Sequence, residues 1–391
     1  MVDDPTPNAF AFPGGYIFIT RGLMGLMRNE AELATVLGHE IGHVTARHSV
    51  SMMSRAQVAQ IGLGLGSIVS PTLAQFSDMA ASGLSLLFLS YGRDAERQAD
   101  DLGFQYALKH GFDVREMVKV FASLQNASRL AGASPLPNWL ASHPNPAERI
   151  TRIQSQLDRL DQPMDAARVG LDDYMQRIDG MMFGADPRQG YFEDNRFSHP
   201  DLALRVEFPS GWRTQNLQQV VLAGSPEGDA VVQLTVAQGL QGDAARSFFA
   251  QEGLTAGRVV EQTINGLPAV IGQFQADAQN GKVAGLAAFI RHRDQTFRLL
   301  GFTPVQQFGR HESAFRTTIS SFAPLTDRAA LARQPDRIVI ERPSQAMTLA
   351  GFNQRLPSVI DIQTLGLINQ LPSPESRIPA RTPVKRIVRG Q

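Results

Sequence analysis

The sequence of 391 residues contains no cysteine. Disulfides, thiol catalysis and cysteine-ligated metal sites are therefore excluded. A net charge of one sign is also missing, because 37 basic side chains balance 37 acidic ones. No overall field thus favours nucleic acid or an acidic membrane surface as a partner. An uninterrupted run of about 20 apolar residues is absent too, so we predict no membrane-spanning helix.

The N-terminus, MVDDPTPNAF, lacks the basic start and the apolar run of a signal peptide. The apolar segment 58–89 is broken by glycines, Pro71, Gln75 and Asp78. We interpret it as buried helices, with peripheral membrane association as the alternative. The last fifteen residues are predicted to be a solvated basic tail and contain Arg377, Arg381, Lys385, Arg386 and Arg389.

Length and pattern predict an α+β multidomain protein. Residues 1–160 are expected to be mostly helical, with one hairpin at Asn8–Thr20 around Pro13-Gly14-Gly15. Residues 161–200 have no clear pattern and are predicted to be a connecting segment. Residues 201–326 predict an antiparallel sheet with helices packed on it, and 335–391 a small module of strand, helix, helix and strand.

Periodicity gives the expected elements in more detail. In the first region we expect helices over 30–46, 51–70, 72–88, 92–110, 113–130 and 146–160. In the second we expect strands over 202–208, 220–223, 231–237, 270–276, 282–292 and 296–302, with helices from Asp243 and over 305–320. Asn280-Gly281 is the hairpin signal between two of these strands. In the third we expect strands at 337–341 and 384–388 and helices over 346–356 and 362–371.

The stretch VLGHEIGHVTARH contains the strongest chemical signal. His39 and His43 are four residues apart, which on a helix leaves them about 40° apart in rotation and one turn apart in height. Both imidazoles can therefore reach one ion. Glu40 lies between them around the helix and can serve as a general base. This spacing predicts two ligands of a zinc ion.

A surface helix that merely contains two histidines is the alternative. Gly38 and Gly42 argue against it, because a helical glycine costs about 1 kcal/mol relative to alanine. We therefore predict that a neighbouring element packs closely against them. His48 would point about 140° away from His43 on a continuing helix, so we predict a hydrogen bond for it rather than metal ligation. Arg47 is predicted to share the metal-side face.

A third ligand must come from another segment, and YGRDAERQADDLG offers one. Glu96 and Asp100 are also four residues apart on a predicted helix. One can ligate the ion while the other accepts a hydrogen bond from a histidine ring. A solvated charged face is the alternative for this pair taken alone.

NAFAFPGGYIFITRGLM, EAELATVLGHEIGHVTARH and RDAERQAD, in this order, resemble metallopeptidase family forty-eight, which contains HtpX, the CAAX prenyl endopeptidases and the BepA-type proteases. The resemblance implies a gluzincin-type zincin fold and one Zn²⁺ per chain, held by His39, His43 and Glu96. It implies that Glu40 is the catalytic base and that Asp100 supports a ligand.

The loop ASHPNPAERI resembles the soluble, exported branch of that family, in which a histidine can approach the metal as a fourth ligand. His143 is the matching residue. The alternative for it is a loop histidine hydrogen-bonded near Pro144. We also expect the oxyanion of the reaction to need a second donor, for which His143, Arg93 and Arg47 are the candidates.

The C-terminal half carries no catalytic motif. FPSGW and TTISSFAPL resemble the PsbP-like fold, and TLAGFNQR with LGLINQLP resembles LysM-like modules. A LysM-like module would imply contact with peptidoglycan. BepA-type proteases continue into tetratricopeptide repeats, which this sequence lacks.

Together these features predict a zinc-dependent endopeptidase of cell-envelope protein quality control, acting on unfolded or misfolded polypeptides. The resemblance implies a periplasmic or otherwise exported location. Because the hairpin starts at residue 8 and no signal peptide precedes it, we expect the N-terminus of this chain to be truncated. The alternative is a latent or non-catalytic zinc-bound adaptor or chaperone-like protein that acts through its C-terminal domains.

Overall fold

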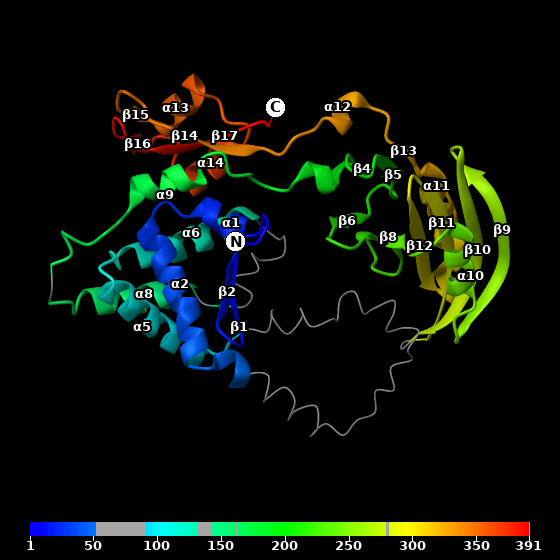
Figure 1. Cartoon of the computed structure of the whole chain (residues 1–391), viewed down its shortest axis with the longest axis horizontal. Coiled ribbons are helices and arrows are strands. Elements are labelled where there is room, and N and C mark those ends of the chain that lie inside the picture. The colour runs from blue at the N-terminus through cyan, green and yellow to red at the C-terminus, as the bar shows by residue number, and fades with distance from the viewer. Residues whose placement is uncertain (52–90, 132–142, 145, 162, 279–280, 391) are drawn as a thin grey trace. The chain divides into compact units, whose positions relative to one another are not determined.

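The computed structural model describes residues 1–51, 91–131, 143–144, 146–161, 163–278 and 281–390 (Figure 1). These residues form two compact units. The first unit contains those of 1–51, 91–185 and 335–390, and the second contains those of 186–334. We expected the C-terminal module to be a separate unit. It is instead part of the unit that contains the helix with His39 and His43. None of the helices in the described part is long and apolar enough to cross a membrane.

The first unit contains the hairpin that the sequence predicts. Its helices are α1 Arg21–Leu26, α2 Glu30–Thr45, α5 Arg93–Lys109, α6 Glu116–Ala131, α8 Pro146–Leu157, α9 Leu171–Ile178, α13 Leu349–Arg355 and α14 Ile362–Ile368. Its strands pair antiparallel as β1 Ala9–Phe12 with β2 Tyr16–Ile19, β14 Arg337–Glu341 with β17 Val384–Val388, and β15 Met347–Thr348 with β16 Arg377–Ile378. The helices predicted over 51–70 and 72–88 lie, from residue 52 onward, outside the described residues.

Helix α2 begins at a clear capping signal. The side chain of Asn29 accepts a hydrogen bond from the Glu32 amide at 2.8 Å, which satisfies one of the unpaired N–H groups of the first turn. Glu30 and Glu32 also lie in that turn, where negative charge interacts favourably with the helix dipole.

Helices α2 and α5 cross at small residues. A Cβ atom on Gly38 would lie 3.0 Å from the Gly103 carbonyl oxygen, and one on Gly42 would lie 3.1 Å from the Ala99 backbone. A Cβ atom on Gly103 would lie 2.7 Å from the backbone nitrogen of His39. The close approach predicted from Gly38 and Gly42 is confirmed.

The C-terminal segment completes the core of the first unit. Leu23 of α1 and Val36 of α2 belong to one buried cluster with Phe352, Ile368 and Ile387. In Figure 1, β14 and β17 lie beside α9, with which β14 is in contact. Burial of this apolar surface is the main favourable term that joins the C-terminal segment to the N-terminal helices.

Lys385 corrects our expectation of a solvated basic tail. Its side chain is fully buried. The ammonium donates to the carbonyl oxygens of Gly25 at 2.7 Å, Met27 at 2.5 Å and Ile368 at 2.9 Å. These carbonyls lie at the C-terminal ends of α1 and α14, which are rich in unpaired acceptors and carry partial negative charge. Lys385 therefore caps two helices at once.

The second unit is built on a seven-stranded antiparallel sheet with the order β6-β7-β8-β12-β11-β10-β9. Its strands are β6 Arg213–Asn216, β7 Val221–Gly224, β8 Val231–Ala237, β9 Leu254–Ile264, β10 Leu267–Ala278, β11 Gly281–His292 and β12 Gln295–Pro304. A smaller sheet has the order β13-β5-β4-β3, from β3 Tyr191–Glu193, β4 Arg196–His199, β5 Leu204–Glu207 and β13 Ala323–Pro324. The helical elements are η2 Pro187–Gln189, α10 Gln241–Phe249, η3 Val305–Gln307, α11 Phe308–Ser321 and α12 Arg328–Leu331.

The two longer helices of this unit cover opposite faces of the large sheet. Phe248 of α10 packs in one buried cluster with Phe289, whereas Phe315 of α11 packs in another with Ala288. Phe289 and Ala288 are neighbours on β11 and point to opposite faces. The predicted antiparallel sheet with helices packed on it is thus confirmed. The expected connecting segment 161–200 instead contains α9, η2, β3 and β4, and β6 and β9 were not predicted.

Candidate metal centre

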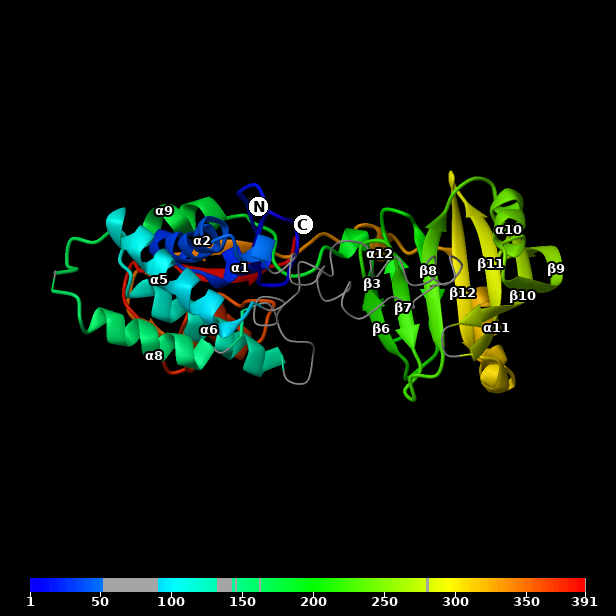
Figure 2. The ribbon, with the colours of Figure 1, turned by 90° about the horizontal axis from the view of Figure 1, so that it is seen from below.

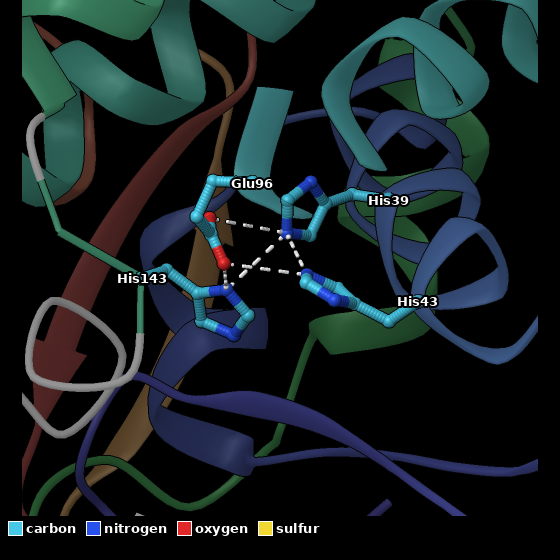
Figure 3. Close-up of side chains that lie close together, drawn as sticks. All are labelled: His39, His43, Glu96 and His143. Atoms are coloured by element: carbon cyan, nitrogen blue, oxygen red, sulfur yellow. Dashed lines mark hydrogen bonds and ion pairs between the residues drawn. The ribbon is translucent and has the colours of Figure 1, made fainter. Parts of the chain in front are cut away.

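Four side chains from three segments converge in the first unit. His39 and His43 come from α2, Glu96 from α5 and His143 from the chain just before α8 (Figure 3). All four are buried, and one ligand atom of each lies within 4.8 Å of the others. The structure therefore brings together the three ligands that the sequence predicts and the histidine whose role it left open.

The spacing of these atoms suits a small cation. His39 Nε2 lies 3.0 Å from His43 Nε2 and 3.3 Å from His143 Nδ1. Glu96 Oε1 lies 3.4 Å from His43 Nε2 and 2.9 Å from His143 Nδ1. Tetrahedral zinc with ligands at about 2.1 Å separates those ligands by about 3.4 Å. Three imidazoles and one carboxylate at this spacing fit zinc in both donor type and geometry.

Glu40 lies beside this group and is fully buried. Within the described part of the chain, neither of its carboxylate oxygens has a hydrogen-bond partner. His143 Nε2 lies 3.6 Å from Oε1 of Glu40. A buried carboxylate without hydrogen bonds is costly, so its place beside a metal-type donor set indicates a chemical role.

Asp100 and Arg149 support the centre from behind. His39 Nδ1 lies 2.9 Å from Asp100 Oδ1, and Arg149 donates to both oxygens of that carboxylate. Burial raises the pKa of Asp100, but the charge of Arg149 and the hydrogen bond with His39 together lower it to about 2. Asp100 therefore stays ionised and accepts a hydrogen bond from Nδ1–H of His39, which leaves the lone pair of Nε2 to bind a cation at the centre.

His43 is held in a similar way by neighbours on its other side. His48 Nδ1 lies 3.0 Å from His43 Nδ1, so His48 makes the kind of hydrogen bond that we predicted for it. The ring of Tyr91 stacks on His43 at a centroid distance of 4.0 Å, and its hydroxyl pairs with Ser49 at 2.8 Å. These contacts orient the ring so that Nε2 faces the other donors.

Two predicted residues do not lie at the centre. Helix α2 ends at Thr45, and Arg47 adopts a left-handed backbone conformation with φ of 56° and is exposed. The prediction for Arg47 assumed a continuing helix and was wrong. Arg93 is exposed at the first turn of α5, one helical turn before Glu96, and does not line the centre.

Arg149 and Tyr91 were missed from the sequence. Both lie within stretches that contain a candidate ligand, since Arg149 follows His143 by six residues in ASHPNPAERI and Tyr91 opens the stretch that contains Glu96. A single arginine or tyrosine has no periodic pattern, so proximity to a predicted ligand was the available signal.

Comparison with known proteins agrees with this geometry. A family model described as "Peptidase family M48" matches residues 1–157. These residues are an M48 metallopeptidase domain. The chain is 36% identical over 159 residues to a putative beta-barrel assembly-enhancing protease of Vibrio cholerae, covering 39% of this chain and 32% of that protein. It is 32% identical over 168 residues to the mitochondrial metalloendopeptidase OMA1 of Bos taurus, covering 40% and 32%.

The chain thus spans about a third of the length of these curated relatives. The M48 match ends before the second unit begins. Among solved structures, cyanobacterial PsbP from Synechocystis is similar, with 16% identity and a TM-score of 0.28. The match covers 33% of this chain and 91% of the PsbP chain.

Proposed function

We propose that this protein is a zinc-dependent endopeptidase. The observation that carries the proposal is the convergence of His39, His43, Glu96 and His143 beside a buried carboxylate, Glu40, that has no hydrogen-bond partner in the described part of the chain. The M48 assignment of residues 1–157 supports it.

His39, His43 and Glu96 would hold the zinc ion. When bound, zinc polarises the scissile carbonyl and makes water a stronger acid. Glu40 accepts the proton of the attacking water and returns it to the leaving amine. Its oxygens are free to do so because no hydrogen bond from a described residue occupies them. Asp100 and Arg149 keep His39 in the orientation that this arrangement needs.

His143 decides whether the centre is open. Catalytic zinc sites usually have three protein ligands, whereas structural sites have four. With His143 in place the chain supplies four donors, and His143 Nε2 also faces Glu40. We propose that this conformation is latent and that His143 withdraws from the site before a substrate enters. A protein that never leaves this state would be the non-catalytic adaptor.

Unfolded or misfolded polypeptides are the substrates that we propose. The two-stranded sheet β1–β2 lies against α2 and is not extended by a further strand in the described part. An extended chain can pair with such an edge without a strict sequence requirement. One of the relatives is named a putative beta-barrel assembly-enhancing protease, and we propose that this protein acts in the quality control of the cell envelope. Peptidoglycan contact through the C-terminal segment stays a prediction.

The test is cleavage of casein by the zinc-loaded protein, with zinc content measured in parallel. We expect Glu40→Gln to bind one zinc per chain and to cleave nothing, while the control Glu375→Gln, at an exposed position, behaves like the wild type. His143→Ala should cleave faster than the wild type if the described state is latent. Equal, non-zero cleavage by the wild type and Glu40→Gln would refute the mechanism. No cleavage by any variant, with zinc bound, would favour the adaptor.

A further inference from the structure

The α10 face of the large sheet contains an unexpected cation. Residues that pair directly across neighbouring strands point to the same face. Arg298 of β12 pairs with Thr235 of β8 on one side and with Phe289 of β11 on the other. Phe289 packs against Phe248 of α10. The row Thr235, Arg298 and Phe289 therefore lies on the face that α10 covers.

Helix α10 covers only part of this face. It contacts β9, β10, β11 and β12 (Figure 2). Where it ends, a cavity of about 810 Å³ lies between α10, β8, β12 and the turn that joins β6 to β7. This volume lies within the range of small-molecule sites, about 300–1,000 Å³. Its lining includes Gln218, Gln219, Val236, Phe248, Gln251 and Arg298.

Arg298 has no counter-charge there. No ion pair among the described residues includes it, and its Nε is buried without a hydrogen-bond partner. Its guanidinium carbon lies 6.0 Å from the Phe248 ring. Burial lowers the pKa of Arg298, and no acidic group among the described residues offsets that effect. A partly buried cation without a partner is costly, and an apolar side chain would suit this register position better unless an anion binds.

The described lining residues of the cavity indicate which class of anion could bind. None of them is acidic, and Arg298 is the one cation among them. A single guanidinium matches one carboxylate through two parallel hydrogen bonds. Gln251 has a buried side-chain oxygen without a donor, which an N–H group could supply. Phe248 and Phe289 provide an apolar wall.

We propose that this cavity binds a small organic carboxylate that also carries an amide group, with its carboxylate on Arg298 and its amide near Gln251. The site lies wholly within the second unit, so the proposal does not depend on the peptidase activity.

The probe is N-acetyl-L-phenylalanine, which has a carboxylate, an amide and an apolar ring. Its neutral amide and phenyl phosphate serve as comparison ligands. Each is titrated into the full chain by calorimetry. We expect the acid to bind the wild type at least about tenfold more tightly than the neutral amide, because a charge-assisted hydrogen bond is lost in the latter.

Arg298→Met should weaken binding of the acid by about tenfold or more and leave binding of the neutral amide unchanged. Arg316→Gln, at an exposed arginine paired with Glu312, is the matched control and should bind like the wild type. Circular dichroism should show that Arg298→Met is folded, since the change removes an unpaired cation. Should it misfold, Arg298→Lys, which keeps the charge but not the planar fork, should also weaken binding.

Three results would overturn the proposal: no saturable binding of the acid at millimolar concentration, equal affinity for the acid and its amide, or unchanged affinity in the Arg298 variants. Tighter binding of phenyl phosphate than of the acid would overturn the assignment to a carboxylate.

Discussion

Arg149 holds Asp100 by both oxygens of its carboxylate. Nε donates to Oδ2 at 2.8 Å and Nη2 donates to Oδ1 at 2.6 Å. The guanidinium also lies 4.2 Å from the centroid of the Phe121 ring and 3.0 Å from a Glu96 oxygen. One arginine on α8 thereby fixes an aspartate and a glutamate of α5, and through Asp100 it fixes the ring of His39 on α2.

We therefore predict that Arg149→Met weakens zinc binding by about 10- to 100-fold, the usual cost of losing a group that orients a metal ligand. Competition with a chelator measures this affinity. Arg149→Lys keeps the charge but not the two parallel hydrogen bonds, and it should restore the affinity only in part. Arg152→Met is the matched control, because Arg152 also joins α8 to α5 but binds Asp101, away from the centre. Equal losses in the Met variants at both positions would show a general loss of helix packing instead.

The crossing of α2 and α5 gives a second prediction. Gly103→Ala would place a methyl group 2.7 Å from the backbone nitrogen of His39, so the two helices must separate. Overpacking of this kind costs about 1–3 kcal/mol. We expect lower stability and also weaker zinc binding, because Glu96 lies on α5 and the histidines on α2.

Gly309→Ala is the control for that variant. Gly309 lies in α11, and a Cβ atom there would meet no atom within 4 Å. Zinc binding should be unchanged in it. Wild-type zinc affinity in Gly103→Ala would show that the centre tolerates movement of α5.

The sequence was most informative where the signal is local. The spacing of His39 and His43 requires only a helix, and Gly38 and Gly42 indicate a close neighbour without naming it. The identity of that neighbour, α5 with Gly103, depends on long-range packing that no local pattern contains. Arg47 was misplaced for a local reason, because the prediction extended α2 beyond its end at Thr45.

The C-terminal strands show both what a local pattern predicts and what it does not. The bounds of β14 and β17 agree with the prediction, since alternation determines a strand. We interpreted Lys385 as solvated because a lysine is seldom fully buried. That interpretation was wrong. Its acceptors are carbonyls of α1 and α14, and backbone acceptors leave no trace in side-chain composition.

Lys385 gives the third prediction. Lys385→Met keeps much of the apolar stem but leaves the three carbonyl oxygens without their donor. An unpaired buried acceptor costs about 1–3 kcal/mol, so with three of them we expect a loss of about 3 kcal/mol or more in the free energy of unfolding. Urea unfolding followed by the helical signal of circular dichroism measures it. Lys282→Met, at an exposed lysine of the second unit, should change the unfolding free energy little. A loss below that of the control variant would contradict the capping role.

Glu32 gives the last prediction, which concerns pH. Burial raises the pKa of this carboxyl from 4.5 to about 7, against the hydrogen bonds from the Arg28 amide and Gln370. Between these two values the folded protein keeps a proton that the unfolded chain has released, so stability falls as pH rises. The stabilising contribution is complete below 4.5 and is lost as pH rises through about 7.

Glu32→Gln cannot titrate and should lack this decline. The unfolding free energy of the wild type minus that of Glu32→Gln should therefore decrease from pH 4.5 to about 7 and then level off. Glu375→Gln, at an exposed glutamate of the same unit, should run parallel to the wild type over the same interval. A difference that stays constant or grows with pH would show that Glu32 is ionised throughout, in which case the buried ammonium of Lys385 is its counter-charge.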